Sequence, residues 1–198
     1  AHAGSECKRD GVHPWEATLT EIRNKGKLSN GEQVPELQDF ISEVMKAGSC
    51  TRLWLDIKNI TSPKTLTDYP INACKRACEI ITEMKAQNFV EFICTGNQTV
   101  MAKSNEYARA AGVEIGWMGN QPASVYQQKS YTWANLSTTY MSQGGGERTI
   151  DEFTKADIAI SVFNADDDAT MNYYISKAKQ MKAICTNYPK KLINKMKK

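Results

Sequence analysis

The sequence lacks several features that mark specialised classes of protein. It contains no hydrophobic run that approaches the roughly 20 residues of a membrane-spanning helix, and its first residues do not resemble a signal peptide. Its formal net charge of +3 at pH 7 is too small to indicate a nucleic-acid-binding surface. We therefore expect no transmembrane segment and no nucleic-acid partner.

Metal-binding cysteine pairs and histidines are also scarce. The 6 cysteines contain no C-x-x-C pair, so a zinc cluster is not expected. Cys74 and Cys78 are one helical turn apart, which favours two buried thiols on one helix face. Only 2 histidines, His2 and His13, are available for acid–base chemistry. Neither the cysteines nor the composition fixes the cellular compartment.

The composition is that of an ordinary globular protein. Hydrophobic residues make up 41% of the chain and charged residues 24%. A chain of 198 residues with this balance can bury a substantial core. We expect a single domain that covers residues 1–198.

Segments typical of strands and of helices alternate along the chain. The first thirty residues are expected to form a loop with at most one helical turn. Six strands followed by helices predict a parallel sheet with right-handed crossovers. The expected strands are 53–57, 90–94, 113–118, 132–137, 158–163 and 183–186, and the expected helices are 35–47, 71–87, 98–111, a short one from Pro122, 150–156, 167–177 and a terminal helix.

The first predicted strand ends in an acid and a base. Asp56 and Lys58 are two residues apart, so their side chains lie on the same face of the strand. In parallel α/β proteins the carboxyl ends of the strands are where active sites are built. The alternative is a solvated strand end without function, because strands often stop where charge begins.

Other polar or aromatic motifs have a structural explanation beside a functional one. Asp166, Asp167 and Asp168 precede a predicted helix and are interpreted as caps and dipole partners rather than a metal site. Trp117, at the end of a strand, is a candidate for contact with a substrate head group, although aromatic residues there also serve packing.

Four short motifs, in order, resemble those of the glycerophosphodiester phosphodiesterase family. Members of this family have "P-T-L" before a helix, a strand that ends "E-I-K", a late "W-T-V-N" strand and a closing "T-D-x-P". The corresponding stretches here are Val34-Pro35-Glu36-Leu37, Leu55-Asp56-Ile57-Lys58, Val162-Phe163-Asn164 and Thr186-Asn187-Tyr188-Pro189.

The resemblance implies a TIM (β/α)₈ barrel of the phospholipase C-like phosphodiesterase type. It also implies metal-dependent hydrolysis of a small-molecule glycerophosphodiester to glycerol phosphate and an alcohol, with a divalent cation, Ca²⁺ or Mg²⁺. Carried over by position, Asp56 is a metal ligand and Lys58 faces the phosphate. His2 corresponds to the family's second catalytic histidine; the alternative is that Ala1-His2-Ala3-Gly4 corresponds to the first histidine motif. His13 is the alternative histidine and is expected to be an ordinary surface residue.

The family pattern is incomplete in this chain. The "H-R-G" and "E-x-D" motifs are absent, and six of the eight expected β/α units are recognisable. Either an N-terminal part of roughly 50 to 60 residues is missing from the sequence, or the chain is a diverged member without a full metal site. We favour missing residues, because a barrel without two adjacent strands would expose two unpaired sheet edges.

Three functions are therefore considered. The first is a metal-dependent phosphodiester hydrolase with His2, Asp56 and Lys58 in its site. The second is a catalytically impaired module that binds a phosphate ligand or a partner on the same fold. The third is an aldolase-type enzyme that forms a Schiff base on Lys58, which the neighbouring carboxylate disfavours. The released alcohol and the oligomeric state cannot be derived from the sequence.

Overall fold

The computed structural model describes residues 12–13, 15–48, 50–59 and 68–197. His2 and Cys7 lie outside these residues. The chain divides into two compact units, Ala1–Ile115 (unit 1) and Gly116–Lys198 (unit 2), which are described separately.

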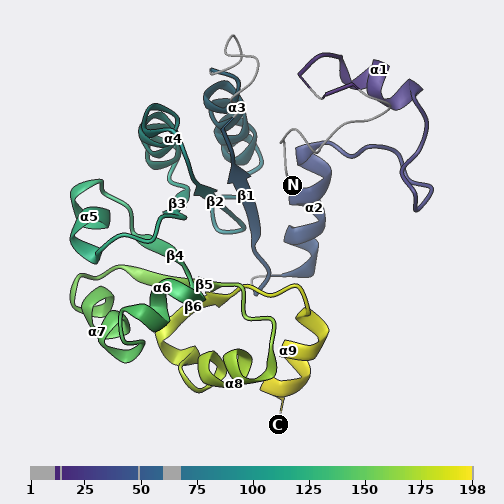
Figure 1. Cartoon of the computed structure of the whole chain (residues 1–198). Helices are drawn as coiled ribbons and strands as arrows, with labels where there is room; N and C mark the ends of the chain where they lie inside the picture. The colour runs from purple at the N-terminus through teal and green to yellow at the C-terminus, as the bar shows by residue number, and fades with distance from the viewer. Residues whose placement is uncertain (1–11, 14, 49, 60–67, 198) are drawn as a thin grey trace. The chain divides into compact units, whose positions relative to one another are not determined.

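The described residues of unit 1 form two parallel strands and four helices before the start of β3 (Figure 1). The strands β1 (Leu53–Ile57) and β2 (Val90–Cys94) pair in register from Leu53 with Val90 to Ile57 with Cys94. The helices α2 and α4 contact β1 and β2 respectively, and α3 packs against both helices. The helices are α1 (Leu19–Asn24), α2 (Leu37–Ala47), α3 (Tyr69–Glu83) and α4 (Gln98–Ala110).

The core of unit 1 follows from hydrophobic periodicity. Leu55 and Ile57 alternate with the less buried Trp54 and Asp56 along β1, and both are buried. Every residue of β2 is buried, as expected for a parallel strand covered on both faces. The thiols of Cys74 and Cys78 are buried on one side of α3, which confirms that prediction.

Unit 2 continues the alternation of strands and helices. The short strand β3 (Glu114–Trp117) begins in unit 1, and its last two residues pair with β4. The strands β4, β5 and β6 are parallel neighbours in that order. The elements after β3 are α5 (Ala123–Gln128), β4 (Trp133–Ser137), α6 (Thr138–Gln143), α7 (Glu147–Lys155), β5 (Ala159–Phe163), α8 (Asp168–Ser176), the 3₁₀ turn η2 (Ala178–Gln180), β6 (Met181–Ile184) and α9 (Pro189–Met196).

Trp133 is fully buried in the centre of unit 2. Its register neighbour on β3 is Gly116, where a Cβ atom would lie 2.2 Å from the indole ring. The ammonium of Lys182 lies 5.4 Å from the centroid of the same ring, within the range of a cation–π contact. Gly116 is therefore required so that the indole can lie flat against the neighbouring strand.

The prediction of an α/β fold with six strands is confirmed for the described residues, and within each unit the paired strands are parallel. Those residues do not form the eight strands of a full TIM barrel. None of the helices in the described part of the chain could span a membrane.

Some boundaries differ from prediction for local reasons. The helix α1 has 6 residues instead of one turn, because Thr18 and Glu21 form a capping box at its start. The helix α6 was not predicted; Ser137 caps it by accepting a hydrogen bond from the Tyr140 amide. The strand β6 begins at Met181, two residues before the predicted start.

Candidate functional site

The polar residues with a candidate chemical role in unit 1 lie at the carboxyl end of β1. Alternation along the strand places Leu55 and Ile57 in the core, so Asp56 and Lys58 project on the opposite face. The strand ends at Ile57, and Lys58 follows it directly. The predicted same-face arrangement is therefore present.

Asp56 and Lys58 form a partly buried ion pair. The Nζ of Lys58 lies 2.7 Å from the Oδ2 of Asp56. The Asp56 side chain is 15% exposed and the Lys58 side chain 29%, so both groups are substantially screened from water. The other carboxylate oxygen of Asp56, Oδ1, is buried and has no hydrogen-bond partner among the described residues. Buried carboxylate oxygens are normally satisfied, so this oxygen has capacity for a ligand.

A second charged contact lies at the other end of the same strand pair. Arg52, before β1, places its Nε 3.7 Å from Oε1 of Glu91 on β2, and Glu91 is 7% exposed. Trp54 lies between the two pairs along β1, and the register pairs it with Glu91. This face of β1 and β2 therefore carries charged side chains at both ends instead of a continuous apolar surface.

Asn59 adds a polar group that the sequence did not single out. Its side chain packs against Gly96, where a Cβ atom would lie 2.2 Å from the Asn59 Nδ2. Gly96 follows β2 and has a φ of +98°, a conformation that favours glycine. The Asn59 Oδ1 is buried, and no hydrogen-bond partner for it occurs in the part of the chain that the structure describes. No sequence signal links these residues, because the contact joins two loops that lie far apart along the chain.

The described residues supply only part of a ligand set for a divalent cation. Hard cations such as Ca²⁺ and Mg²⁺ take oxygen ligands, and the Oδ1 of Asp56 is an oxygen of the right kind. Within residues 12–13, 15–48, 50–59 and 68–197, however, no three side chains from His, Cys, Asp and Glu come together. Asp56 therefore fits the role of one cation ligand among several.

Of the two histidines considered as catalytic residues, the structure describes His13 but not His2. His2 lies outside the described residues. His13 is half-buried, and its ring stacks on Trp15 at a centroid distance of 4.2 Å. Its backbone N–H donates to Glu16, and its Nδ1 is buried without a hydrogen-bond partner within residues 12–13, 15–48, 50–59 and 68–197. The stacking on Trp15 covers part of the ring, and the expectation that His13 is an ordinary surface residue without a catalytic role stays a prediction.

Trp117 lies in unit 2, within an aromatic cluster. Its ring is 4.8 Å from that of Tyr126 and 5.7 Å from that of Tyr131, measured between centroids. The Tyr126 hydroxyl donates to the carbonyl of Gly119. Packing accounts for these contacts, and contact of Trp117 with a substrate stays a prediction.

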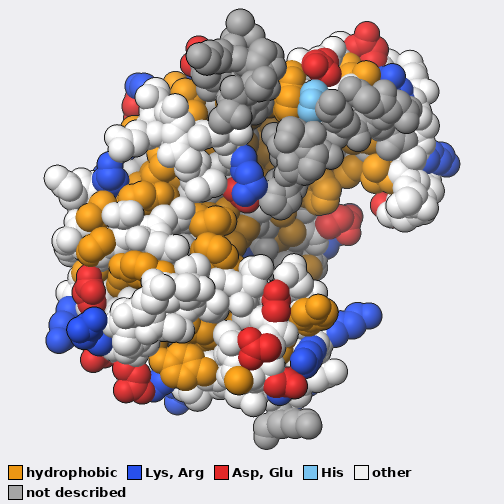
Figure 2. All heavy atoms as spheres, viewed as in Figure 1, with side chains coloured by type: hydrophobic (Ala, Val, Ile, Leu, Met, Phe, Trp, Pro, Cys, Tyr) orange, Lys and Arg blue, Asp and Glu red, His pale blue; other side chains and the backbone are white. Residues whose placement is uncertain are grey.

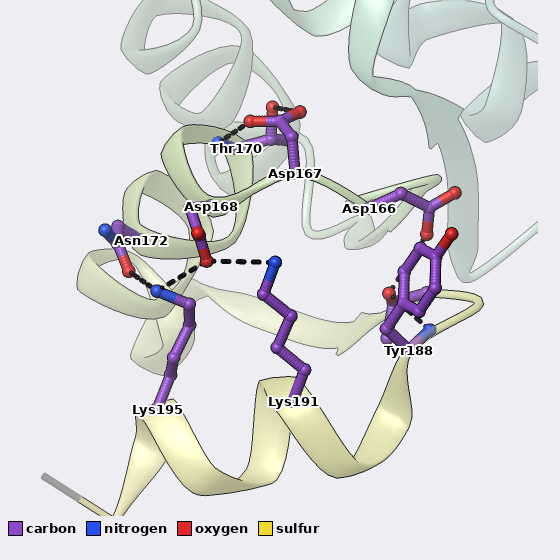
Figure 3. A network of polar contacts seen from close by, with 9 residues as sticks. Asp166, Asp167, Asp168, Thr170, Asn172, Tyr188, Lys191 and Lys195 are labelled. Carbon is purple, nitrogen blue, oxygen red and sulfur yellow. Dashed lines mark hydrogen bonds and ion pairs between the residues drawn. The ribbon is translucent and has the colours of Figure 1, made fainter.

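The acids at the start of α8 make the polar contacts drawn in Figure 3, and the prediction of a helix cap is confirmed for Asp167. The Asp167 carboxylate accepts a hydrogen bond from the Thr170 amide at the start of the helix. Asp168 forms ion pairs with Lys191 and Lys195 of α9. These contacts fasten α8 to the end of the chain, and no group of three His, Cys, Asp or Glu side chains suited to a metal occurs among the residues described.

Comparison with known proteins gives a result at the level of structure only. No protein-family model matches the sequence, and no curated protein matches it. A glycerophosphodiester phosphodiesterase from Parabacteroides distasonis is similar in structure, with a TM-score of 0.75 and 17% identity. The match covers 94% of this chain and 74% of that one.

Two further solved structures are similar to this chain. The putative glycerophosphoryl diester phosphodiesterase from Silicibacter pomeroyi has a TM-score of 0.68 at 12% identity, covering 92% of this chain and 70% of that one. The glycerophosphodiester phosphodiesterase from Agrobacterium tumefaciens has a TM-score of 0.58 at 11% identity, covering 79% and 60%. The chain therefore has a fold like that of glycerophosphodiester phosphodiesterases, as the sequence motifs predicted.

Proposed function

We propose that this chain is a phosphodiester hydrolase that cleaves a small glycerophosphodiester to glycerol phosphate and an alcohol. The observation that carries the proposal is the ion pair of Asp56 and Lys58 at the carboxyl end of β1. In a fold like that of glycerophosphodiester phosphodiesterases, this is where substrate-binding groups are expected.

The two side chains suit complementary tasks in this reaction. The Lys58 ammonium can bind a phosphoryl oxygen, since it is a compact cation with three donors. The Oδ1 of Asp56 can bind a divalent cation, Ca²⁺ or Mg²⁺, together with further ligands. When bound, such a cation neutralises phosphate charge. In this proposal, His2 transfers the proton between the attacking and the leaving oxygen.

Hydrolysis of a glycerophosphodiester with added Ca²⁺ or Mg²⁺ tests the proposal, with release of glycerol phosphate as the measurement. We expect Asp56→Asn and Lys58→Met each to lower kcat/KM by roughly 100-fold, as the loss of one electrostatic contact in an active site does. The matched controls are Lys103→Met and Glu106→Gln. These two residues form a 2.8 Å ion pair on the exposed face of α4, and we expect unchanged turnover.

The same assay separates the two histidines. His2→Ala should abolish turnover, whereas His13→Ala should retain it and lose stability through the lost stacking on Trp15. Absence of turnover by a chain verified to be full length would refute the hydrolase. So would equal activity of the wild type and the Asp56 and Lys58 variants.

A non-catalytic phosphate-binding module is the second candidate. It is favoured by the incomplete set of metal-ligating side chains within the part of the chain that the structure describes. Titration calorimetry with inorganic phosphate distinguishes the two. The module predicts binding that Lys58→Met removes, without any turnover of a diester.

A further inference from the structure

The terminal helix α9 has one side that the rest of unit 2 does not cover. On its inner side, Leu192 is buried, while Lys191 and Lys195 point towards α8 and pair with Asp168 at 3.2 and 2.8 Å (Figure 3). Lys195 also donates to the side-chain oxygen of Asn172. These contacts fix which side of α9 faces away from unit 2.

Helical spacing places Lys190, Ile193 and Lys197 on the opposite side, and Met196, four residues after Leu192, is exposed at the border of that side; we call these four residues the α9 outer face. Lys190, Ile193 and Lys197 follow at steps of three and four, and Met196 is three residues after Ile193. None of the four is among Lys191, Leu192 and Lys195, the residues named above on the inner side of α9.

The α9 outer face combines exposed apolar groups with cations that have no partner. Ile193 is 50% exposed and Met196 54%, which places them among the few exposed large hydrophobic residues of the described chain. No ion pair or hydrogen bond engages the side chains of Lys190 and Lys197 among the described residues. Figure 2 shows basic, acidic and hydrophobic side chains next to one another over the region of α8 and α9.

Charge is strongly segregated between α9 and the rest of the chain. The sequence from Tyr188 onward contains lysines at 190, 191, 195, 197 and 198 and no acid, although the whole chain has a net charge of only +3. The remainder is therefore net negative. An extended anionic surface would attract this end and repel the rest, which orients the approach through α9.

We propose that the α9 outer face docks on the surface of an anionic phospholipid bilayer. Apolar side chains flanked by lysines on one helix face are the composition of helices that lie in the membrane interface. The lysines would contact lipid phosphates while Ile193 and Met196 enter the headgroup region. Because the face is small, the binding is weak and reversible, and it requires anionic lipid. This site is independent of the proposed hydrolase site.

Vesicle flotation of the full chain tests this proposal. The vesicles contain phosphatidylcholine either alone or with about 30% phosphatidylglycerol, enough to give a negative surface potential. We expect binding to the anionic vesicles only. Lys190→Gln with Lys197→Gln should weaken it roughly thirtyfold, since each lysine near such a surface contributes about 1 kcal/mol.

The hydrophobic part has its own variant and control. Ile193→Ser with Met196→Ser should weaken binding at least about tenfold, because two apolar side chains no longer enter the interface. The matched controls are Lys75→Gln with Lys155→Gln, two exposed lysines on α3 and α7, and Phe40→Ser, a 43% exposed residue of α2. We expect these to bind like the wild type.

Several results would overturn the proposal. These are equal partition into neutral and anionic vesicles, no partition into either, or control variants that lose as much binding as the α9 variants. Sedimentation velocity can give a further overturning result. If the chain self-associates through Ile193 and Met196 and does not bind vesicles, the α9 outer face is an interface with a second copy of the chain.

Discussion

At the scale of single residues, Gly96 determines how closely the loops after β1 and β2 approach each other. Its α-carbon leaves no room for a side chain beside the Asn59 amide. The close approach packs the loop after β2 against Asn59, the residue that directly follows Lys58. The geometry of the candidate site therefore depends on a residue without any functional group.

Gly96→Ala should destabilise the chain more than the same change at Gly112. Both glycines have positive φ, +98° and +68°, but a Cβ at Gly112 meets nothing within 4 Å. We expect a loss of about 1 kcal/mol in the free energy of unfolding for Gly112→Ala, and at least about 1 kcal/mol more for Gly96→Ala. Urea unfolding monitored by circular dichroism measures both.

A double variant checks the cause of that difference. In Gly96→Ala with Asn59→Ala the collision is removed, so the two changes together should cost less than their sum. Equal losses at Gly96 and Gly112, or strict additivity with Asn59→Ala, would show that the loop yields without strain.

For single residues, the sequence predicted the relative positions of side chains that are close along the chain. The period of two placed Asp56 and Lys58 on one face, and the structure joins them in an ion pair. The contact of Asn59 with Gly96 and the stacking of His13 on Trp15 depend on loop conformations that no periodic pattern encodes. His2 stays a prediction, since it lies outside the described residues.

At the scale of elements, one carboxylate fastens the loop after β5 to the loop after β6. Asp166 accepts hydrogen bonds from the backbone and side-chain N–H groups of Asn187 and from the Thr186 hydroxyl. The backbone N–H of Asn187, followed by these side-chain donors, lowers the pKa of Asp166 below its ordinary 3.8. The ionised carboxylate is therefore preferred in the folded chain.

The acid stability of the chain should depend on this contact. A carboxyl whose pKa is lower in the folded state stabilises the fold above the unfolded pKa, and the stabilisation is lost as pH falls through the folded value. We expect Asp166→Asn to be less stable than wild type near neutral pH and to differ progressively less below about pH 4. Urea midpoints between about pH 6 and about pH 2.5 measure this convergence.

The control for this series is Asp68→Asn. Asp68 is exposed before α3, and its side chain forms no capping hydrogen bond with that helix. We expect its urea midpoints to follow wild type over the whole range. A constant offset of Asp166→Asn at every pH would show that the loss is not linked to ionisation.

Helices and strands with a clear hydrophobic periodicity were predictable from the sequence. Helices that depend on capping hydrogen bonds at their ends were not. The helix α2 and the strands β1 and β2 occur where periodicity placed them. The helix α6 depends on the cap from Ser137, and its short polar sequence carries no apolar stripe. The helix α3 ends at Glu83, earlier than predicted, and Lys85 after it has a φ of +54°.

At the scale of the whole molecule, binding of a divalent cation at the proposed site should increase the thermal stability of the chain. A ligand that binds only the folded chain stabilises it, by about 2.7 kcal/mol at 100 times its dissociation constant. For a chain of this size we expect Ca²⁺ or Mg²⁺ to raise the Tm by several degrees, roughly 2–4 °C per kcal/mol. Differential scanning fluorimetry with and without chelator measures the shift.

Two variants assign the shift to its site. Asp56→Asn should abolish it, because the neutral amide is a weaker ligand for a hard cation. Glu106→Gln, in the exposed pair on α4, should keep it. A shift that survives in Asp56→Asn would place the cation elsewhere.

The fold could be anticipated at this scale, but the complete site could not. Four motifs in order predicted a chain like glycerophosphodiester phosphodiesterases, and the similar solved structures agree although no more than 17% of residues are identical. Assembly of a full metal site needs side chains from several strands at once. Asp56 is the one metal ligand predicted from the sequence, and no group of three His, Cys, Asp or Glu side chains occurs among the described residues.

The burial of Trp133 between Gly116 and Lys182 provides a built-in optical probe. An indole in such a dry, rigid place emits at shorter wavelength than one in water, and the nearby ammonium influences its brightness. Since Trp54 belongs to unit 1 and Trp133 to unit 2, the two halves of the chain carry separate intrinsic fluorophores. Their emission can reveal whether both halves melt together or one before the other, without any attached dye.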